Sequence, residues 1–261
     1  MRLTTFASGS SGNCALLSFG STHILLDAGI SYRRIRQNLA LSGLTPDSLS
    51  AVLLTHEHSD HIAGLTTMLK RCAVPLLAPR TLANHLRRCV VGAEGRVREV
   101  PVGEPFPLGG VMLRAFHTPH DTDESVGWRV EGQECFALAT DMGCLTEEVR
   151  TGLLGADVVL IEANHDVDML CTGPYPPSLK RRILSDRGHL SNENCGVLAA
   201  FLADRGTKQI VLGHLSRENN TPEKAFRTVR TALGERETAL YVAPPDARLT
   251  LEYTKEPLCL V

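Results

Sequence analysis

The amino-acid sequence predicts an α/β protein in which two mixed β-sheets pack together and helices cover their outer faces. Short apolar runs rich in Val, Ile and Leu alternate along the chain with segments of helical periodicity. Hydrophobic residues make up 43% of the 261 positions and charged residues 21%, so the chain can bury a sizeable core. No low-complexity linker divides the sequence, and we therefore expect one domain over residues 1–261.

Eleven runs have the length and the composition of β-strands. The early runs follow one another closely, as in hairpins, whereas later ones are separated by helical segments, as in βα units. The predicted strands cover residues 14–19, 22–27, 51–55, 74–79, 111–116, 126–131, 135–140, 157–163, 209–214, 239–243 and 248–253.

Helix-start signals precede several of the intervening segments. Ser31 is an N-cap candidate for a helix that ends before Gly43. Ser191 is a second N-cap candidate. Thr221 is a third, because it is followed by Pro222, which suits the first helical position.

Composition and charge argue against several classes of protein. The net charge is −2, so a strongly basic coat is absent and any contact with nucleic acid has to come from local patches. We expect no secretion signal in the first ten residues, and no apolar run approaches the roughly 18 residues that span a membrane. The eight cysteines form no Cys-x-x-Cys pair, which favours reduced thiols in the core of a cytoplasmic protein.

The heptapeptide THEHSDH directly follows the apolar run AVLL. His56 and His58 are two positions apart in an extended segment, so their side chains point to the same side. Asp60 and His61 follow as the chain turns toward a predicted helix over residues 62–72. Neutral imidazoles and a carboxylate suit zinc, manganese or iron(II), and a solvated loop would rarely combine them after a buried strand. The motif therefore indicates a metal site.

Other candidate ligands follow predicted strands farther along the chain. The segment HTPHD holds His117 and His120. Asp141 and His214 each end a predicted strand. Because α/β proteins present functional side chains at strand ends, we expect these groups to join the heptapeptide in one site.

Two nearly identical segments, GHLSNEN and GHLSREN, begin at Gly188 and Gly213. Their flanks do not repeat, so the pair does not indicate a repeat architecture. The first segment precedes a predicted helix and the second follows a predicted strand. We expect two loops that converge on one site.

LLDAG, THEHSDH, His120, Asp141 and His214 resemble, in order, the five motifs of the metallo-β-lactamase fold. The resemblance covers nearly the whole chain and implies a four-layer αβ/βα sandwich. The opening SGSSGNC and the two HLS segments are similar to the YycJ/WalJ branch, whose members resemble DNA exonucleases that act from a 5′ end and are connected to DNA mismatch repair. The paired HLS segments also resemble ribonuclease Z.

The resemblance implies two divalent metal ions per chain, zinc or manganese, with iron as a further candidate. Two such cations about 3.5–4 Å apart can share a water and lower its pKa toward neutrality. The implied ligands are His56, His58 and His120 for the first metal, Asp60, His61 and His214 for the second, and Asp141 as a bridge.

The resemblance also implies roles for residues beside the metals. Asp27 in LLDAG would support the metal loop, and Asp60 would orient the attacking hydroxide as well as bind metal. His189 matches a ribonuclease Z histidine that binds no metal, and it would donate a hydrogen bond or proton to the substrate. Two alternatives stay open: His117 could replace His120 as the third-motif ligand, and His165 could line the pocket.

Two segments are candidates for binding the substrate. Ser11 and Asn13 lie in the small-residue segment SGSSGN, where backbone N–H groups could approach a phosphate. The basic cluster of Lys180, Arg181 and Arg182 lies just before the first HLS segment. A tight turn and a solvated helix face, respectively, are the alternative interpretations.

The sequence thus predicts a dinuclear metal-dependent phosphodiester hydrolase, and the resemblance favours a 5′-end DNA exonuclease connected to mismatch repair. A ribonuclease Z-like RNA nuclease and a small-molecule phosphodiesterase are the alternatives. An inactive nucleic-acid-binding protein is a hypothesis of another class, and seven intact ligand candidates argue against it. We expect nucleic acid, above all DNA, as partner and no membrane contact, and a homo-oligomer remains open.

Overall fold

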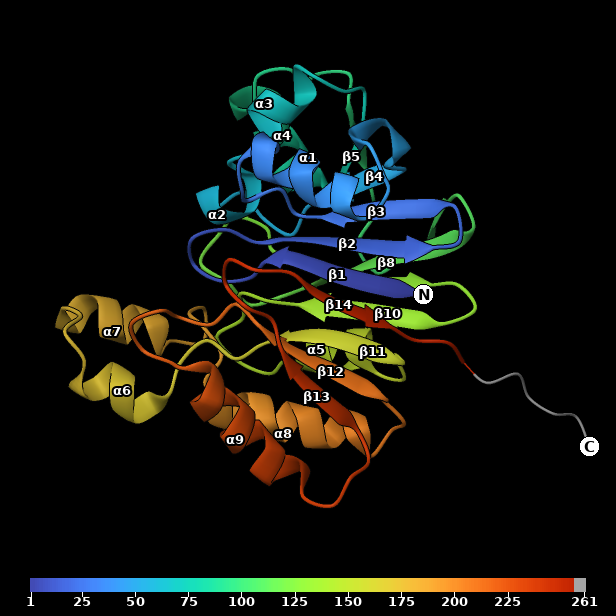
Figure 1. The fold of residues 1–261 in the computed structure, drawn as a ribbon. Helices are drawn as coiled ribbons and strands as arrows, with labels where there is room; N and C mark the ends of the chain where they lie inside the picture. The colour runs from blue at the N-terminus through green and yellow to red at the C-terminus, as the bar shows by residue number, and fades with distance from the viewer. Residues whose placement is uncertain (256–261) are drawn as a thin grey trace, which may run out of the picture.

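The computed structural model describes residues 1–255 and contains two seven-stranded β-sheets in that part of the chain (Figure 1). The first sheet has the strand order β14-β1-β2-β3-β4-β5-β6. Its members are β1 (Arg2–Ala7), β2 (Cys14–Phe19), β3 (Thr22–Leu26), β4 (Ala51–Leu53), β5 (Leu76–Ala78), β6 (Val97–Glu99) and β14 (Leu249–Glu252).

The second sheet has the mirror-like strand order β13-β12-β11-β10-β9-β8-β7. Each sheet has three antiparallel and three parallel strand pairs, which confirms the prediction of two mixed sheets. The members of the second sheet are β7 (Phe106–Leu108), β8 (Val111–His117), β9 (Val126–Glu131), β10 (Cys135–Ala139), β11 (Val158–Glu162), β12 (Gln209–Gly213) and β13 (Ala239–Val242).

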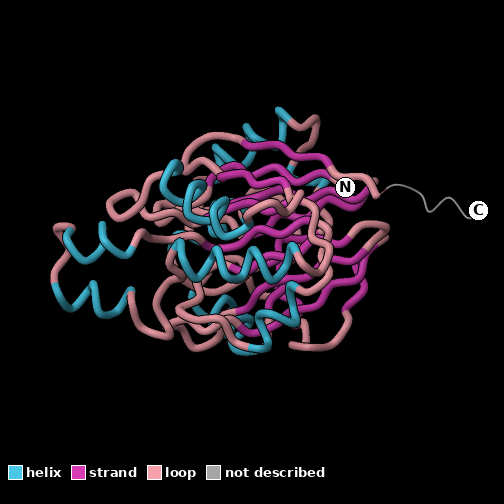
Figure 2. The backbone as a smooth tube through the Cα atoms, turned by 90° about the horizontal axis from the view of Figure 1, so that it is seen from below, coloured by secondary structure: helices cyan, strands magenta, loops and turns pink. Residues whose placement is uncertain are grey.

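Helices cover the outer face of each sheet and complete the predicted four layers (Figure 1). The first sheet is covered by α1 (Tyr32–Leu41), α3 (Leu65–Leu69) and α4 (Arg80–Cys89), with the short α2 (Ser59–Ile62) and a 3₁₀ turn, η1 (Pro46–Ser48), beside them. The second is covered by α5 (Glu147–Leu153), α8 (Asn192–Ala203) and α9 (Pro222–Leu233). The helices α6 (Val167–Thr172) and α7 (Pro177–Ile183) form a hairpin that projects from the molecule (Figure 1, Figure 2).

The three predicted N-caps are confirmed. The side chains of Ser31, Ser191 and Thr221 each accept a hydrogen bond from the backbone N–H three residues later, at the starts of α1, α8 and α9. Such a cap satisfies a helix N–H that has no partner within the helix, and its loss costs about 1 kcal/mol.

The core between the sheets includes Trp128, which is fully buried on β9. Its indole Nε1 donates to the carbonyl oxygen of Leu54 at 3.0 Å, and Leu54 follows β4 of the other sheet. This bond joins the second sheet to the backbone that leads into THEHSDH, so the packing of the core also positions the candidate metal loop.

Some elements differ from the prediction. The helix predicted over residues 62–72 is split into α2 and α3 around Gly64. A Cβ at Gly64 would lie 2.2 Å from the carbonyl oxygen of Ile30, so glycine allows this segment to pack closely against the loop after β3. The strands β1, β6 and β7 and the hairpin of α6 and α7 were not predicted, because their apolar patterns are short.

Two expectations from composition can be compared with the described residues. Their seven cysteines are free, but only Cys14, Cys72 and Cys195 are buried, and Cys89 and Cys171 are exposed, so the prediction of core thiols is wrong for these two; Cys259 lies outside the described residues. None of the helices in residues 1–255 has the length and apolar character needed to cross a membrane.

Candidate metal centre

The candidate residues lie in loops that follow strands of both sheets. Asp27 follows β3 and the heptapeptide THEHSDH follows β4, whereas Asp141 follows β10 and His214 follows β12. The carboxyl ends of parallel strands meet at one edge of a sheet, and the two sheets pack on each other, so these loops meet at one end of the sandwich. The seven predicted ligands form overlapping groups whose donor atoms lie within 4.8 Å of one another.

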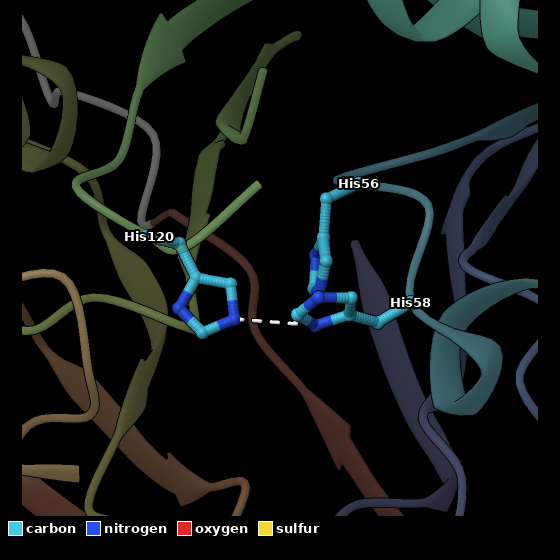
Figure 3. Close-up of side chains that lie close together, drawn as sticks. All are labelled: His56, His58 and His120. Carbon is cyan, nitrogen blue, oxygen red and sulfur yellow. Dashed lines mark hydrogen bonds between the residues drawn. The ribbon is translucent and has the colours of Figure 1, made fainter. Parts of the chain in front are cut away.

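The first group consists of His56, His58 and His120. His56 and His58 come from one segment, and His120 faces them from the other sheet (Figure 3). His58 Nδ1 lies 3.3 Å from His120 Nε2, and the His56 ring centroid lies 4.7 Å and 5.1 Å from those of His58 and His120. Burial and the neighbouring His61 hold the pKa of His56 well below its usual value, so this imidazole is neutral and its lone pair can bind a cation.

The second group consists of Asp60, His61 and His214. His61 Nε2 and His214 Nε2 lie 3.3 Å and 3.4 Å from Asp60 Oδ2. Although burial by itself raises the pKa of a carboxyl group, the hydrogen bonds from His214 and His61 hold the pKa of Asp60 far below its usual value. The carboxylate is therefore ionised and able to bind a cation.

Asp141 lies between the two groups. One carboxylate oxygen is 3.3 Å from His61 Nε2, and the other is 3.4 Å from His214 Nε2 and 3.7 Å from His120 Nε2. Two buried atoms of this centre, Asp141 Oδ2 and His56 Nε2, have no hydrogen-bond partner. Because buried polar atoms are almost always partnered, these two fit a site in which a metal ion completes their coordination. Five imidazoles and two carboxylates are also a donor set that zinc and manganese accept.

Asp27 holds the metal loop through three hydrogen bonds. Its carboxylate accepts from the backbone N–H of Thr55 at 2.9 Å, from the Thr55 hydroxyl at 2.9 Å and from His61 Nδ1 at 2.7 Å. The last bond fixes the His61 ring with Nε2 toward Asp60 and Asp141.

Glu162, at the end of β11, is a functional residue that the sequence analysis did not identify. Its buried carboxylate accepts from His189 Nδ1 at 2.7 Å and from His214 Nδ1 at 2.9 Å. The other oxygen accepts the backbone N–H groups of Met142 and Leu190. Glu162 also forms a group with Asp141, His189 and His214 whose donor atoms lie within 4.8 Å of one another. Because both of its oxygens already accept hydrogen bonds, its surroundings fit a residue that orients the two histidines. A charged residue at the end of an otherwise apolar strand was the available signal.

Burial and charge act in opposite directions on the Glu162 carboxyl. Burial alone would favour the neutral acid, but the charges and hydrogen bonds of His189 and His214 hold its pKa at about 2. Glu162 is therefore an anion at neutral pH, and it keeps a proton on Nδ1 of both histidines. The Nε2 atom of each ring is then the one available to a metal or a substrate.

His189 lies beside the metal groups and lines a cavity. Its ring centroid is 5.1 Å from that of His120 and 5.3 Å from that of His214. Burial lowers the pKa of His189, whereas the charge and hydrogen bond of Glu162 raise it by more. The pKa of His189 therefore lies above its usual value. The side chain is 21% exposed, which leaves it accessible from the cavity.

The two HLS segments converge, as predicted. Asn192 in the first and Asn220 next to the second form a reciprocal amide pair with distances of 3.0 Å and 2.9 Å. The backbone N–H of His214 donates to Ser8 Oγ at 2.9 Å, which brings the segment SGSSGN to the same place.

The alternatives left open at His117 and His165 have different surroundings. His117 Nδ1 lies 3.0 Å from Glu148 on α5, and the ring is 52% exposed and belongs to neither metal group. His165 is almost fully buried, its ring nitrogens have no partner, and it too belongs to neither group in the described residues.

The predicted substrate-binding residues have partners within the protein. Asn13 Nδ2 lies 3.2 Å from Asp60 Oδ2 and 3.1 Å from His61 Nε2, so Asn13 is part of the frame of the centre. Ser11 Oγ accepts from Arg217.

In the basic cluster, Lys180 Nζ donates to the carbonyl oxygen of Cys171. Arg182 pairs with Asp121, next to His120, and Arg181 is exposed. Of the three, Arg182 lies at the rim of the metal centre, because it lines the same cavity as His189.

Comparison with known proteins gives three findings. The family model described as the beta-lactamase superfamily domain matches residues 22–215. The chain is 35% identical over 240 residues to the exodeoxyribonuclease WalJ of Streptococcus pneumoniae. This alignment covers 90% of the chain and 88% of WalJ. It is 33% identical over 238 residues to the exodeoxyribonuclease YycJ of Bacillus anthracis, with 90% of each chain covered.

Among solved structures, the metallo-β-lactamase fold protein YhfI from Bacillus subtilis superposes with a TM-score of 0.71. The alignment covers 96% of this chain and 100% of YhfI at 14% identity, which supports the fold alone.

Proposed function

Since the chain belongs to the metallo-β-lactamase fold hydrolases, and within them to the group of the WalJ and YycJ proteins, we propose that it is a metal-dependent nuclease that degrades DNA from a strand end. The observation that carries this proposal is the pair of donor groups on either side of Asp141, with His189 beside them at the wall of a cavity. The exodeoxyribonuclease activity in the names of the two relatives supports DNA as substrate.

We assign two divalent ions to the centre, zinc or manganese, with iron as a further candidate. When bound, such a pair lowers the pKa of a shared water and neutralises charge on a phosphoryl oxygen. The first ion would be held by His56, His58 and His120, the second by Asp60, His61 and His214, and Asp141 would bind both.

Asp60 and His189 are the residues that we assign to proton handling. Asp60 is 20% exposed, and its carboxylate can accept a hydrogen bond from the attacking water and orient it. His189 is held by Glu162 through Nδ1, so its other ring nitrogen can donate to the phosphate or to the leaving oxygen. The two side chains thus divide activation of the nucleophile and protonation of the leaving group between them.

Nucleic acid would contact the rim of the centre. Arg182 lines the cavity, and Lys180 and Arg181 extend positive charge along α7. We include Ser11 in this rim, because its hydroxyl holds the exposed guanidinium of Arg217 close to the segment SGSSGN. These charges would bind the phosphate backbone, which needs no sequence-specific contact.

The decisive experiment gives the zinc- or manganese-loaded protein four substrates: end-labelled DNA, end-labelled RNA, covalently closed plasmid and a chromogenic phosphodiester. We expect release of nucleotides from linear end-labelled DNA and survival of covalently closed plasmid, and a chromogenic phosphodiester reports on the centre itself. His85→Ala, on α4 away from the centre, is the matched control for His58→Ala, which should abolish activity on every substrate.

Each other result points to an alternative. Cleavage of end-labelled RNA but not DNA would indicate a ribonuclease, and hydrolysis of the chromogenic ester alone would indicate a small-molecule phosphodiesterase. If the metal-loaded protein hydrolyses none of the four substrates, the hypothesis of an inactive nucleic-acid-binding protein is favoured. The connection to DNA mismatch repair stays a prediction, which the spontaneous mutation rate of a deletion strain would test.

A further inference from the structure

A cavity of about 160 Å³ adjoins the metal centre between the α6–α7 hairpin and the loops that carry His120 and His189. Since one water occupies roughly 30 Å³ in the liquid, the cavity has room for about five waters. A cavity of this size can take one flat ring, with the attached sugar and phosphate at its rim.

The hairpin supplies an apolar wall. Tyr175, in the loop between α6 and α7, lines the cavity together with Leu179 and Ile183 of α7. Tyr175 and Leu179 are half-buried, and Ile183 is 8% exposed. An aromatic ring and two aliphatic side chains form a surface on which a base of any sequence can lie.

The rest of the lining is largely polar. It includes Arg182, which is also on α7, together with Asp121, Asn164, His189 and the hydroxyl-bearing residues Ser10 and Ser216. The guanidinium of Arg182 is held at the rim by its ion pair with Asp121, next to the proposed ligand His120. A positioned guanidinium can bind a phosphate through two parallel hydrogen bonds.

Several contacts hold the cavity in its present shape. His189 N donates to the carbonyl oxygen of Ile183 at 2.9 Å, and His120 Nδ1 lies 3.1 Å from the carbonyl oxygen of Gly188. A Cβ at Gly188 would lie 2.1 Å from the Ile183 oxygen, so glycine is needed where the hairpin meets the site loop. The cavity is therefore formed before any substrate binds.

We propose that this cavity receives the single terminal nucleotide of a DNA strand, with its base on Tyr175 and Leu179 and its terminal phosphate at Arg182. The proposal rests on the nuclease function proposed above and adds the reason for action at ends. A strand end can place one nucleotide in this cavity while the next phosphodiester lies at the metal centre, because no chain has to continue past Tyr175 and Leu179.

Binding of deoxythymidine 5′-monophosphate to the metal-loaded protein, measured by titration calorimetry, tests the cavity without reference to turnover. Tyr175→Ala should weaken this binding roughly tenfold to hundredfold, as expected for loss of one stacked base. Leu179→Trp fills the same cavity and should also weaken it. Neither change should alter the binding of inorganic phosphate, which would contact the metal centre and the polar part of the lining but not Tyr175 or Leu179.

Arg182→Ala should weaken both ligands, by roughly tenfold to hundredfold, because it removes a charged hydrogen-bond donor. Two controls match these variants. Leu184→Trp adds the same bulk to a side chain that is 47% exposed at the end of α7, outside the cavity, and Arg227→Ala removes one positive charge from α9. Both should bind the mononucleotide and phosphate like wild type.

The proposal is overturned if Tyr175→Ala and Leu179→Trp bind the mononucleotide like wild type, or if phosphate binds wild type as tightly as the mononucleotide does. DNA degradation by wild type, measured in parallel, separates the two proposals. If wild type degrades DNA but the cavity variants bind the mononucleotide like wild type, the protein is a nuclease that lacks this subsite. Mononucleotide binding that depends on Leu179, without any DNA degradation, refutes action on strand ends.

Discussion

Three residues of the metal centre adopt a backbone conformation that residues other than glycine rarely adopt. Asp27, Asp141 and His214 have φ angles of 55°, 55° and 56°, and they are the only non-glycine residues with positive φ among residues 1–255. Each such conformation costs of order 1–3 kcal/mol and persists only where its surroundings enforce it. Here Asp27 and His214 directly follow a strand and Asp141 lies two residues after one, so each turns its side chain into the site where the chain leaves the sheet.

His189 and His58 should respond differently to removal of the imidazole. His189→Ala should keep the metal content of wild type and lower kcat by roughly 10²–10⁴, as for a positioned acid or base. His58→Ala should lose metal as well as activity. Elemental analysis and steady-state kinetics on the same preparations separate the two, and loss of metal from His189→Ala would identify His189 as a ligand.

Glu162→Gln keeps the shape of the side chain and removes its charge. An amide cannot accept from His189, His214 and two backbone N–H groups at once, so the two rings lose their common orientation. We expect metal affinity or activity to fall roughly 10–100-fold, the range for residues that orient metal ligands. Glu148→Gln, at an exposed carboxylate on α5, is the control. Wild-type metal affinity together with wild-type activity in Glu162→Gln would refute this role.

At the scale of elements, the α6–α7 hairpin differs from the other helices. Most helices lie against a sheet, whereas this pair projects beside the metal centre and contributes Tyr175, Leu179 and Arg182 to the cavity (Figure 1). Its inner side is held to the site loops, and its basic residues Lys180 and Arg181 extend along α7. The hairpin thus combines a fixed wall with a charged edge.

The charged edge predicts how DNA binding depends on salt. Replacing Lys180, Arg181 and Arg182 together by alanine should weaken binding of long DNA and flatten the plot of log affinity against log salt concentration. Each lost phosphate contact removes about 0.7–0.9 released counterions. Hydrolysis of a small chromogenic phosphodiester should fall no more than it does in Arg182→Ala alone, because Lys180 and Arg181 do not line the cavity at the centre. An unchanged salt slope would make the cluster a solvated helix face.

At the scale of the whole molecule, the metal centre lies at the seam between the two sheets. His56, His58, Asp60 and His61 follow a strand of the first sheet, whereas His120, Asp141 and His214 follow strands of the second. Metal bound at this centre would therefore link the first sheet to the second. The unfolded chain does not hold these side chains together, so the metal would bind the folded state only. A ligand that binds only the folded state stabilises it, by about 4 kcal/mol when its concentration is a thousand times Kd.

Metal removal should lower stability in a way that depends on pH. In the metal-free chain, burial lowers the pKa of His214, but Asp141, Asp60 and Glu162 raise it to about 10, against about 6.5 in an unfolded chain. Protonated His214 therefore stabilises the metal-free fold fully below pH of about 6.5, and this contribution is lost as the pH rises through about 10.

Thermal unfolding checks this prediction. With chelator, the melting temperature should fall between pH 6.5 and 10, and it should fall less in the metal-loaded protein, whose His214 is neutral throughout. Because both sheets share one core, we expect a single cooperative transition, as for one domain. Equal melting temperatures with and without chelator at every pH would contradict a metal that links the sheets. Elemental analysis should give close to two ions per chain.

Local features could be recognised from the sequence because they depend on neighbours in the chain. The N-caps Ser31, Ser191 and Thr221 are of this kind, and so is the spacing of His56, His58, Asp60 and His61, since an extended segment followed by a turn points them together. The strand runs also predicted mixed sheets. Early runs that follow one another closely indicate antiparallel pairs, and later runs separated by helical segments indicate parallel pairs.

Contacts between distant segments were decided only by the tertiary structure. Glu162 reads as the end of an apolar strand, and only packing brings it to His189 and His214, which lie 27 and 52 positions away. Likewise, folding joins Arg182 to Asp121 and makes α7 the wall of a cavity. The sequence alone therefore determined the types of ligand and their local spacing. Which groups share a proton, an ion pair or a cavity depends on how the two sheets and the hairpin pack, since such contacts join residues with no regular separation along the chain.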